Sequence, residues 1–300
     1  MSIIKLLPDS VANQIAAGEV VQRPSSVVKE LLENSVDSGA KTIRLVIKDA
    51  GKTLIHVIDD GIGMNKTDLK KCFFRHTTSK IRKSKDLYSL KTMGFRGEAL
   101  SSIASVSHMS IISNKDNNNS LGYEIKLEGG QEKLFNEVVS TKGTSISVKN
   151  LFFNIPARRN FLKSDNVELK HIIDEFHRIS LINHDINFIF INNNNELFNL
   201  SKSIFKERII RVFGNSSKQK LIPINEETEI AKIKGFVFKP EYSRKTRSAQ
   251  FFFVNKRFIK NSHLNHAVKT AYEGLIQDNL YPSYFLKINV PLNSIDVNIH

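Results

Sequence analysis

The sequence lacks the features that stabilise secreted proteins and those that anchor membrane proteins. It contains a single cysteine, Cys72, so no disulfide can form within the chain. No segment approaches the ~20 consecutive apolar residues that a transmembrane helix needs. The start of the chain, Met1 to Lys5, has neither the basic region nor the long apolar region of a signal peptide. These absences predict a protein of the reducing cytoplasm that does not associate with membranes.

Acidic residues are few relative to basic ones, and the difference is uneven along the chain. The 300 residues hold 44 Lys and Arg against 30 Asp and Glu, a net charge of +14. Residues 201–300 hold 17 basic against 8 acidic residues, whereas residues 1–200 hold 27 against 22. A basic excess favours polyanionic partners such as nucleic acids. A coding sequence biased towards Lys, Asn and Ile would give the same excess, so charge alone leaves DNA binding open.

Length and hydrophobic pattern predict two domains, since 300 residues is long for one compact core. Helical and strand patterns mix over residues 1–200, the polar stretch 192–195 reads as a turn, and a smaller α/β unit follows over residues 201–300. Helices are expected over 24–35, 66–74, 98–106, 167–182, 204–213 and 262–275. Strands are expected over 43–47, 54–58, 109–112, 123–127, 144–148, 186–191, 230–238, 250–254, 285–290 and 295–299.

The helix expected over 24–35 carries the first candidate site. At 3.6 residues per turn, Glu30, Asn34 and Asp37 fall in one narrow stripe, away from the apolar residues that would pack on a sheet. A carboxylate beside an amide oxygen supplies a general base and a hard ligand of the kind Mg²⁺ prefers. Taken by itself, this stripe is equally typical of a solvated polar face.

A second candidate follows the strand expected over 54–58. Asp59 ends this buried strand, and Gly61 and Gly63 come directly after it. A carboxylate there can accept a hydrogen bond from an exocyclic amine such as that of adenine. Glycine has no Cβ, so it allows a flat ring to approach closely. Without the other motifs, Gly61 and Gly63 predict only a tight turn.

A third candidate is a long polar connection that leads into a helix. It contains Thr77-Thr78-Ser79-Lys80 and ends in Gly94-Phe-Arg-Gly97-Glu98-Ala-Leu100. Backbone N–H groups at a helix start, preceded by glycine, form a binding site for phosphate. The polar stretch 76–93 fits a lid that orders over bound nucleotide. Gly143-Thr144 follows these three candidates along the chain and is the last motif of the set.

The order of these motifs resembles that of the GHKL ATPases, a superfamily that includes type II topoisomerases, a heat-shock chaperone, histidine kinases and the MutL mismatch-repair proteins. Longer strings make the chain most similar to the MutL family, and this similarity extends through His300. The strings are Asn13-Gln-Ile-Ala-Ala-Gly18-Glu-Val-Val21, Arg23-Pro24, Glu33-Asn-Ser-Val-Asp37, Arg75-His76 and Pro156-Ala-Arg-Arg159-Asn-Phe-Leu162.

The resemblance implies both a fold and an activity. The fold would be α+β: a two-layer α/β sandwich of the GHKL (Bergerat) type over residues 1–200, then a smaller transducer-like α/β domain over 201–300. Glu30 would activate water for hydrolysis of Mg²⁺·ATP, Asn34 would bind Mg²⁺, and Asp59 would bind the adenine amine. The other expected nucleotide contacts are Asp37, Ser38, Gly61, Gly63, Met64, Thr78, Ser79, Lys80, Gly94, Phe95, Arg96, Gly97, Glu98, Ala99, Leu100 and Thr144.

The resemblance also implies partners. ATP would bring two N-terminal regions together as a homodimeric clamp, and hydrolysis would reset it. The clamp would couple a mismatch-recognition protein of the MutS type to a downstream helicase or nuclease, in a nucleoid-associated cytoplasmic setting. Double- and single-stranded DNA would bind without sequence preference, through phosphate contacts. The residues expected to make those contacts are Arg158, Arg159, Arg257 and Lys260.

Two other functions stay open on the sequence. The ATPase subunit of a type II topoisomerase shares the nucleotide motifs, and a DNA-binding scaffold could carry a vestigial ATP site. The family pattern continues beyond its final His with a lysine that reaches the γ-phosphate, and this lysine lies outside the 300 residues, as does the family's C-terminal dimerisation region. We therefore expect weak hydrolysis, and no endonuclease activity can be assigned.

Overall fold

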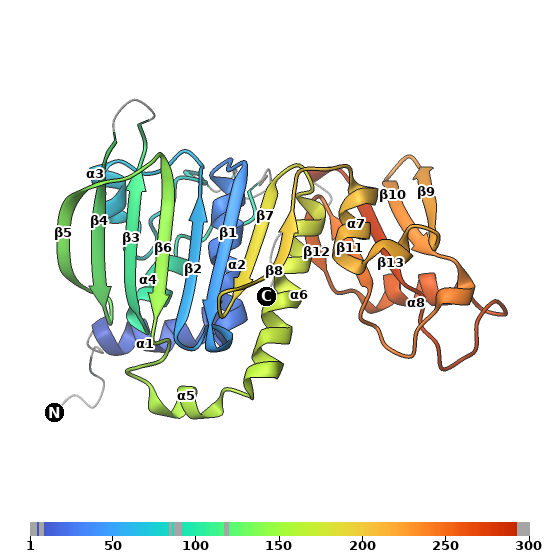
Figure 1. The fold of residues 1–300 in the computed structure, drawn as a ribbon, viewed down its shortest axis with the longest axis horizontal. Helices are drawn as coiled ribbons and strands as arrows, with labels where there is room; N and C mark the ends of the chain where they lie inside the picture. Colours follow the sequence, from blue (N-terminus) through green and yellow to red (C-terminus); the bar gives the residue numbers. More distant parts are fainter. Residues whose placement is uncertain (1–4, 6–8, 84–85, 87–91, 117–119, 293–300) are drawn as a thin grey trace. The chain divides into compact units, whose positions relative to one another are not determined.

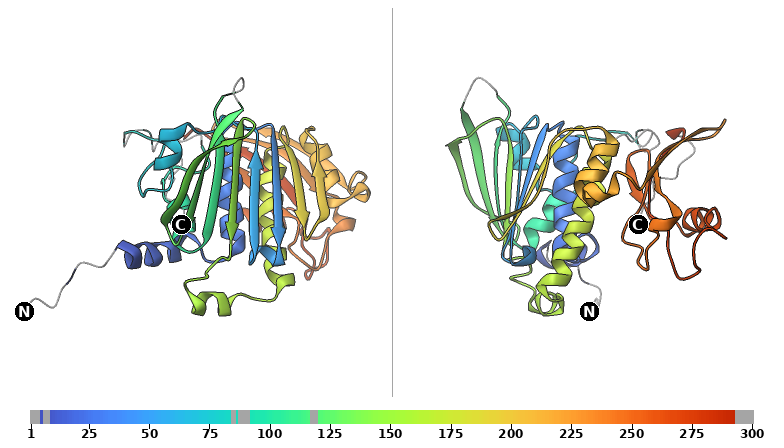
Figure 2. Two further views of the ribbon diagram at one scale, coloured as in Figure 1. Left: turned by 60° about the vertical axis from the view of Figure 1, so that its left-hand side comes forward. Right: turned by 45° about the vertical axis from the view of Figure 1, so that its right-hand side comes forward.

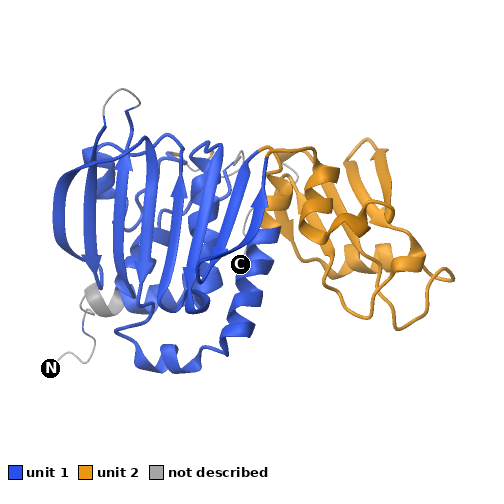
Figure 3. Ribbon diagram, viewed as in Figure 1, with its two compact units in different colours: residues 1–82, 92–177, 186–201 blue, residues 83–91, 178–185, 202–300 orange. Residues whose placement is uncertain are grey.

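The computed structural model describes residues 5, 9–83, 86, 92–116 and 120–292. The strand expected over 295–299 lies outside these residues. The chain divides into two compact units (Figure 3). Unit 1 comprises residues 1–82, 92–177 and 186–201, and unit 2 comprises residues 83–91, 178–185 and 202–300. Each unit is built on its own β-sheet.

The sheet of unit 1 has eight strands in the order β5-β4-β3-β6-β2-β1-β7-β8 (Figure 1). Neighbouring strands run antiparallel except β1 and β7, which are parallel. The strands are β1 (Thr42–Lys48), β2 (Leu54–Asp59), β3 (His108–Asn114), β4 (Leu121–Glu128), β5 (Gln131–Val139), β6 (Gly143–Lys149), β7 (Asn187–Asn192) and β8 (Asn195–Leu200).

Helices cover one face of this sheet, which makes unit 1 a two-layer α/β structure (Figures 1 and 2). The alternation of each strand explains the arrangement. In β1, Ile43, Leu45 and Ile47 are fully buried, while Arg44 and Lys48 between and after them are exposed. The helices of unit 1 are α1 (Asp9–Val20), α2 (Pro24–Asp37), α3 (Lys66–Lys71), α4 (Ala99–Ser105), α5 (Pro156–Phe161) and the first part of α6 (Asp165–Ile182).

Helix α2 has the two-sided pattern that positions the candidate site. It begins at Pro24, whose fixed φ and missing N–H suit a first turn. Val28, Leu31 and Leu32 are buried against the sheet. The polar stripe of α2, with Glu30, Asn34 and Asp37, therefore lies beside the buried face of the helix and does not pack on the sheet. Among the described helices, none combines the length and the apolar character needed to cross a bilayer.

Unit 2 contains a five-stranded sheet in the order β12-β11-β13-β10-β9. Its strands are β9 (Leu221–Glu227), β10 (Lys232–Phe238), β11 (Gln250–Val254), β12 (Arg257–Ile259) and β13 (Tyr284–Asn289), and its helices include α7 (Phe205–Phe213) and α8 (Ser262–Thr270). Phenylalanines fill the core. The rings of Phe251 and Phe285 stack with their centroids 5.5 Å apart, and Phe213 packs on both.

Helices α3 and α8 end several residues before the positions that the sequence pattern predicts. Helix α3 ends at Lys71 instead of residue 74, because turns follow and Thr77 Oγ1 donates to the Lys71 carbonyl oxygen at 2.9 Å. Helix α8 ends at Thr270 instead of residue 275, and Gly274 follows with φ of 75°. A left-handed glycine of this kind commonly follows a helix end.

Candidate nucleotide site

The polar stripe of α2 meets a lysine that is distant in sequence. Lys80 Nζ donates to Asn34 Oδ1 at 2.9 Å and to Asp37 Oδ2 at 2.6 Å. Asp37 also accepts backbone N–H groups from Met93 at 2.8 Å and Gly94 at 3.1 Å. The Asp37 side chain is 7% exposed, so these bonds are shielded from water. Through these hydrogen bonds, Asp37 of α2 contacts both described ends of the expected lid, residues 76–83 and 92–93. Most residues between the two ends lie outside the part of the chain that the structure describes.

Glu30, the expected general base, lies one turn earlier on α2. Its side chain is 23% exposed, and Lys29 Nζ lies 3.1 Å from Glu30 Oε1. Lys29 also lies 3.5 Å from Glu33 Oε2. Burial raises the pKa of Glu33 to about 7, because the more distant Lys29 offsets only part of the lost hydration. Glu30 holds the nearer contact with the lysine.

Asp59, at the end of β2, lies against the last turn of α2. Its Oδ2 accepts from Ser35 Oγ at 2.7 Å, and its Oδ1 accepts from the backbone N–H of Gly61 at 3.0 Å and from Ser38 Oγ at 3.4 Å. Burial raises the pKa of Asp59, and these three donors oppose part of that shift. A carboxylate held in this way retains acceptor capacity for a ligand N–H group.

Glycines let the backbone close around Asp59. A Cβ on Gly61 would lie 1.9 Å from Ser38 Oγ. Gly63 has φ of 64°, and a Cβ there would lie 2.0 Å from the carbonyl oxygen of Asn114. Only glycine fits both the conformation and the space at position 63. Next to it, the Met64 N–H donates to Ser113 Oγ at 2.8 Å, and Ser113 Oγ lies 2.9 Å from Thr144 Oγ1.

The end of the expected lid also converges on α2. A Cβ on Gly94 would lie 3.2 Å from Lys80 Nζ and 3.7 Å from Asn34 Oδ1. Gly97 has φ of 65° and packs against the carbonyl oxygen of Thr77. Glu98 precedes the first turn of α4, and its Oε1 lies 3.2 Å from His76 Nδ1. Thr78 Oγ1 accepts from the Lys80 N–H at 3.1 Å, which shapes the start of this segment.

The structure therefore brings together residues from five segments: α2, the end of β2 with its glycines, residues 77–80, residues 93–98 and the start of β6. Ser79, Phe95, Arg96, Ala99 and Leu100 belong to these segments or directly follow them. Arg96 Cζ lies 5.8 Å from the centroid of the Phe95 ring, so these two side chains contact each other. Ala99 and Leu100 are half-buried at the start of α4.

Two serines complete the site and were not predicted. Ser35 is 3% exposed and Ser113 is 1% exposed, and each donates to a predicted residue or its neighbour. Ser35 lies three residues before Ser38, so the helical spacing contained a usable signal. Ser113 carried no such signal, since only the pairing of β3 with β6 places it opposite Thr144.

The DNA candidates do not join this site. Arg158 lies in α5 with its guanidinium against Gly18, where a Cβ would lie 2.1 Å from Nη2. It lines a cavity of about 200 Å³, together with Arg23, Phe161 and Glu168. Arg159 beside it is exposed. In unit 2, Arg257 begins β12 and is half-buried, and Lys260 directly after β12 is exposed.

The described residues contain no cluster of three or more His, Cys, Asp or Glu side chains that could hold a metal ion. A site based on Asn34 would therefore depend on few protein ligands, as Mg²⁺ sites with phosphate and water ligands do. The ammonium group of Lys80 beside Asn34 Oδ1 shows that this oxygen faces a position where a cation is accepted.

Comparison with known proteins agrees with this geometry. Residues 22–154 match the family model "Histidine kinase-, DNA gyrase B-, and HSP90-like ATPase", and residues 209–300 match "DNA mismatch repair protein, C-terminal domain". The chain is 59% identical over 298 residues to the "DNA mismatch repair protein MutL" of Christiangramia forsetii and 58% identical over 299 residues to that of Flavobacterium johnsoniae. The chain belongs to the MutL family.

Solved structures support the MutL assignment. The "Aquifex aeolicus MutL ATPase domain complexed with ADP" is 29% identical with a TM-score of 0.67, covering 91% of this chain and 93% of that one. The "Crystal Structure of N terminal domain of a DNA repair protein" is 25% identical with a TM-score of 0.83, covering 96% and 90%. The predicted fold, a GHKL sandwich followed by a smaller α/β unit, is confirmed.

The chain spans about half the length of these MutL relatives, because 99% and 100% of it align with 48% and 46% of them. Residues 22–154, which hold every nucleotide candidate from Glu30 to Thr144, are an ATPase domain of the GHKL type. The matched region 209–300 contains Arg257 and Lys260.

Proposed function

We propose that this chain binds and slowly hydrolyses Mg²⁺·ATP and uses the nucleotide to control a clamp in DNA mismatch repair. The observation that carries the proposal is the convergence on α2. Lys80 and the backbone of Met93 and Gly94 meet Asn34 and Asp37 there, within 2.6 to 3.1 Å. A ligand at this place would contact the helix and the lid segment together.

Each end of the site suits a different part of the nucleotide. Asp59, fixed by Ser35 and the Gly61 N–H, can accept a hydrogen bond from the adenine amine. Gly63 lets the backbone pass directly beside the Asn114 carbonyl oxygen, next to this end of the site. Lys80 and the backbone N–H groups of residues 96–100 would bind the phosphates, because positive charge and N–H donors favour anions. Thr144 completes the adenine end through Ser113.

The hydrolytic step depends on Glu30. Its carboxylate would take a proton from the attacking water, and its position one turn before Asn34 directs it towards the phosphate end. Asn34 Oδ1 would bind Mg²⁺, which when present neutralises phosphate charge. Lys29 Nζ, 3.1 Å from Glu30 Oε1, holds this carboxylate in place on α2.

DNA binding, dimerisation and partner coupling belong to the same proposal. Residues 1–200 would form the ATPase domain and residues 201–300 a DNA-facing transducer domain. The described site has its lid segment attached to α2, so nucleotide can couple to the arrangement of that segment. Ordering it would favour a homodimer, and the clamp would then engage DNA, a MutS-type protein and a downstream helicase or nuclease.

Among the DNA candidates, Arg159 and Lys260 fit a phosphate contact better than Arg158. Lys260 and Arg159 are exposed, whereas the guanidinium of Arg158 is held against Gly18. Contacts of this kind would not depend on base sequence.

The experiment that tests the nucleotide site is calorimetric binding of a non-hydrolysable ATP analogue with Mg²⁺. Wild type should bind, Asn34→Ala should lose measurable binding, and Asn136→Ala on exposed β5 should behave as wild type. Failure of both this chain and a version extended beyond His300 to bind would contradict the proposal.

Binding also tests the scaffold alternative. A scaffold with a vestigial site predicts DNA binding that nucleotide does not change.

A further inference from the structure

One end of the five-stranded sheet of unit 2 collects six basic side chains. This end contains the start of β9, the end of β10 and the segment that leads into β11. The backbone joins these segments, since the Lys239 N–H donates to the carbonyl oxygen of Lys220 at 2.8 Å. We call this group the basic rim, and it consists of Lys218, Lys220, Lys239, Arg244, Lys245 and Arg247.

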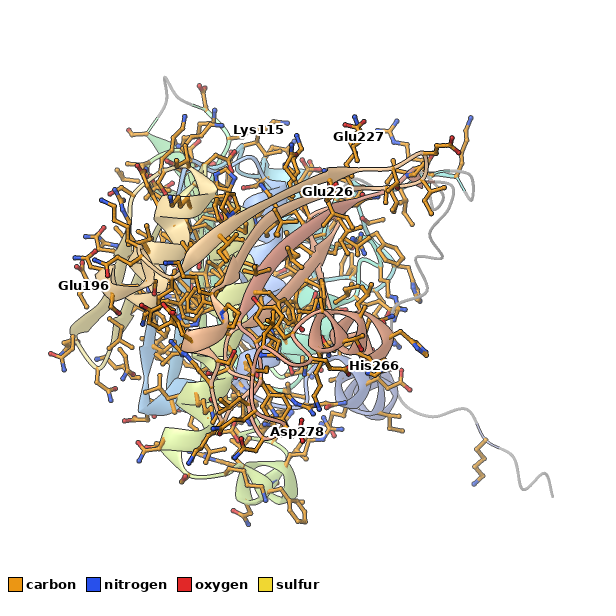
Figure 4. The ribbon with its side chains drawn as sticks, turned by 90° about the vertical axis from the view of Figure 1, so that its right-hand side faces the viewer. Lys115, Glu196, Glu226, Glu227, His266 and Asp278 are labelled. Atoms are coloured by element: carbon orange, nitrogen blue, oxygen red, sulfur yellow. The ribbon has the colours of Figure 1, made fainter. Side chains whose placement is uncertain are left out.

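Within the described part of the chain, no member of the basic rim has a carboxylate oxygen within ion-pair distance. The opposite end of β9 differs, because Glu227 there pairs with Lys232 at 2.5 Å. Asp278 belongs to the segment before β13, at the end of the sheet where the rim lies. Figure 4 shows Glu226 and Glu227 far from Asp278. Asp278 and Glu241 therefore oppose only part of the positive charge.

Aromatic rings alternate with these cations. Lys220 Nζ lies 5.2 Å from the centroid of the Tyr242 ring. Arg247 Cζ lies 4.5 Å from the centroid of the Tyr281 ring. Both tyrosines are half-buried, and Arg247 is exposed. Arg244, two residues after Tyr242, exchanges backbone hydrogen bonds of 2.9 and 2.7 Å with Tyr281. It therefore connects the Lys220–Tyr242 pair with the Arg247–Tyr281 pair.

We propose that the basic rim is a binding surface for single-stranded DNA, with bases stacking on Tyr242, Tyr281 and the guanidinium plane of Arg247. Proteins that bind single strands combine cations along the backbone with aromatic faces for the bases. A duplex offers the same phosphates, but its bases are stacked on each other and cannot reach the rings. An acidic peptide would use the cations without needing the aromatic rings.

The rim lies away from Arg257, whereas Lys260 follows β12 at the rim's own end of the sheet, since Ile259 pairs with Phe252. Tyr284 pairs with Gln250 at the start of β11. Tyr281 precedes Tyr284 by three residues, so it lies on the side of the rim. Arg257 pairs with Val254 at the other end of β11. The length of β11 separates the two positions by about 13 Å. The inference rests on the proposed function only in taking DNA as the partner.

The test compares two single strands that carry equal phosphate charge. Fluorescence anisotropy at low salt would measure binding of the whole chain to a labelled oligothymidine and to an abasic strand of the same length. Wild type should bind the thymine strand roughly 10-fold tighter, the scale expected when bases stack on aromatic side chains. Tyr281→Leu should remove most of this difference while leaving the salt dependence unchanged.

Two variants serve as matched controls. Tyr123→Leu removes an equivalent ring in unit 1, where Lys66 Nζ lies 5.6 Å from the ring centroid. Lys232→Gln removes a positive charge of unit 2 that already has an acidic partner. Both should keep the wild-type preference for thymine.

Equal binding of the two strands by wild type would overturn the inference, as would an unchanged preference in Tyr281→Leu. Tighter binding of duplex than of the thymine strand would do the same. If duplex binds and depends on Arg257 while base preference is absent, the rim inference alone fails. If no DNA binds at all, the DNA part of the proposed function fails with it.

Discussion

Lys29 lies between two carboxylates of α2 and contacts them unequally. Its Nζ is 3.1 Å from Glu30 and 3.5 Å from Glu33. Burial alone would lower the pKa of Lys29, but the neighbouring glutamates, Glu30 foremost, raise it overall. Glu33, whose side chain is 16% exposed, has its pKa raised to about 7 by burial. The charge of Glu33 therefore opposes folding at neutral pH.

Glu33→Gln should change how stability depends on pH. The pKa of Glu33 is higher in the folded chain than its usual value of 4.5, so its protonated form favours folding. That contribution is complete below about 4.5 and is lost as pH rises through about 7. At pH 8 the variant should gain about 1–3 kcal/mol in unfolding free energy relative to wild type.

Urea unfolding at pH 5 and pH 8, without nucleotide or Mg²⁺, measures this effect. Glu137→Gln, on exposed β5, is the control and should not alter the pH dependence. A Glu33→Gln variant that lost stability equally at both values would contradict the expected charge effect.

At the scale of elements, Gly63 is constrained by conformation and by space. Gly63→Ala would place a Cβ 2.0 Å from the Asn114 carbonyl oxygen while keeping φ of 64°. Gly39, after α2, has φ of 74°, but a Cβ there would meet no atom within 4 Å, so Gly39→Ala tests conformation alone. We expect Gly39→Ala to cost about 1 kcal/mol and Gly63→Ala at least about 2 kcal/mol more. Thermal unfolding of the two variants would compare them, and equal losses would show that the Asn114 contact is unimportant.

Regular hydrophobic patterns made α2, β1 and β2 predictable, since one face of each is buried. Strand β5 was missed because most of its side chains are exposed on both faces, so its sequence shows no alternation of apolar and polar residues. Strands β8 and β9 were missed for the same reason, as polar edge strands have little apolar periodicity. Helices α1 and α5 were also missed.

The site could be predicted in part. The stripe on α2 and the glycines after β2 are local patterns, and the resemblance to a known family added the rest of the expected contacts. The bond from Lys80 to Asn34 joins residues 46 positions apart, so no local spacing could predict it. The roles of the individual side chains stay predictions until nucleotide binding is measured.

For the whole molecule, the uneven charge of the sequence now has a location. Residues 201–300 hold the greater share of the excess, and in unit 2 the basic rim lacks acidic partners among the described residues. Binding to any polyanion should therefore be strongly salt-dependent, through release of counterions from the phosphates.

Arg257→Glu should reduce duplex DNA binding several-fold at low salt, because it replaces a phosphate contact with a like charge. The logarithm of affinity against the logarithm of salt concentration should also become less steep. Anisotropy titrations at several salt concentrations measure both effects. Glu196→Lys, on exposed β8 of unit 1, is the control, because it changes the net charge of the chain by the same amount with the opposite sign. Unchanged affinity and slope in Arg257→Glu would exclude Arg257 from the DNA contact.

The ammonium of Lys80 between Asn34 and Asp37 has a kinetic consequence. A magnesium ion that binds at Asn34 would find a cation already there, so its loading would be an exchange and not a simple addition. The lysine would have to leave a 2.6 Å contact with a carboxylate that is 7% exposed before the ion could bind. Association should then level off at high ligand concentration, at the rate with which Lys80 departs, and Lys80→Met should restore a linear dependence.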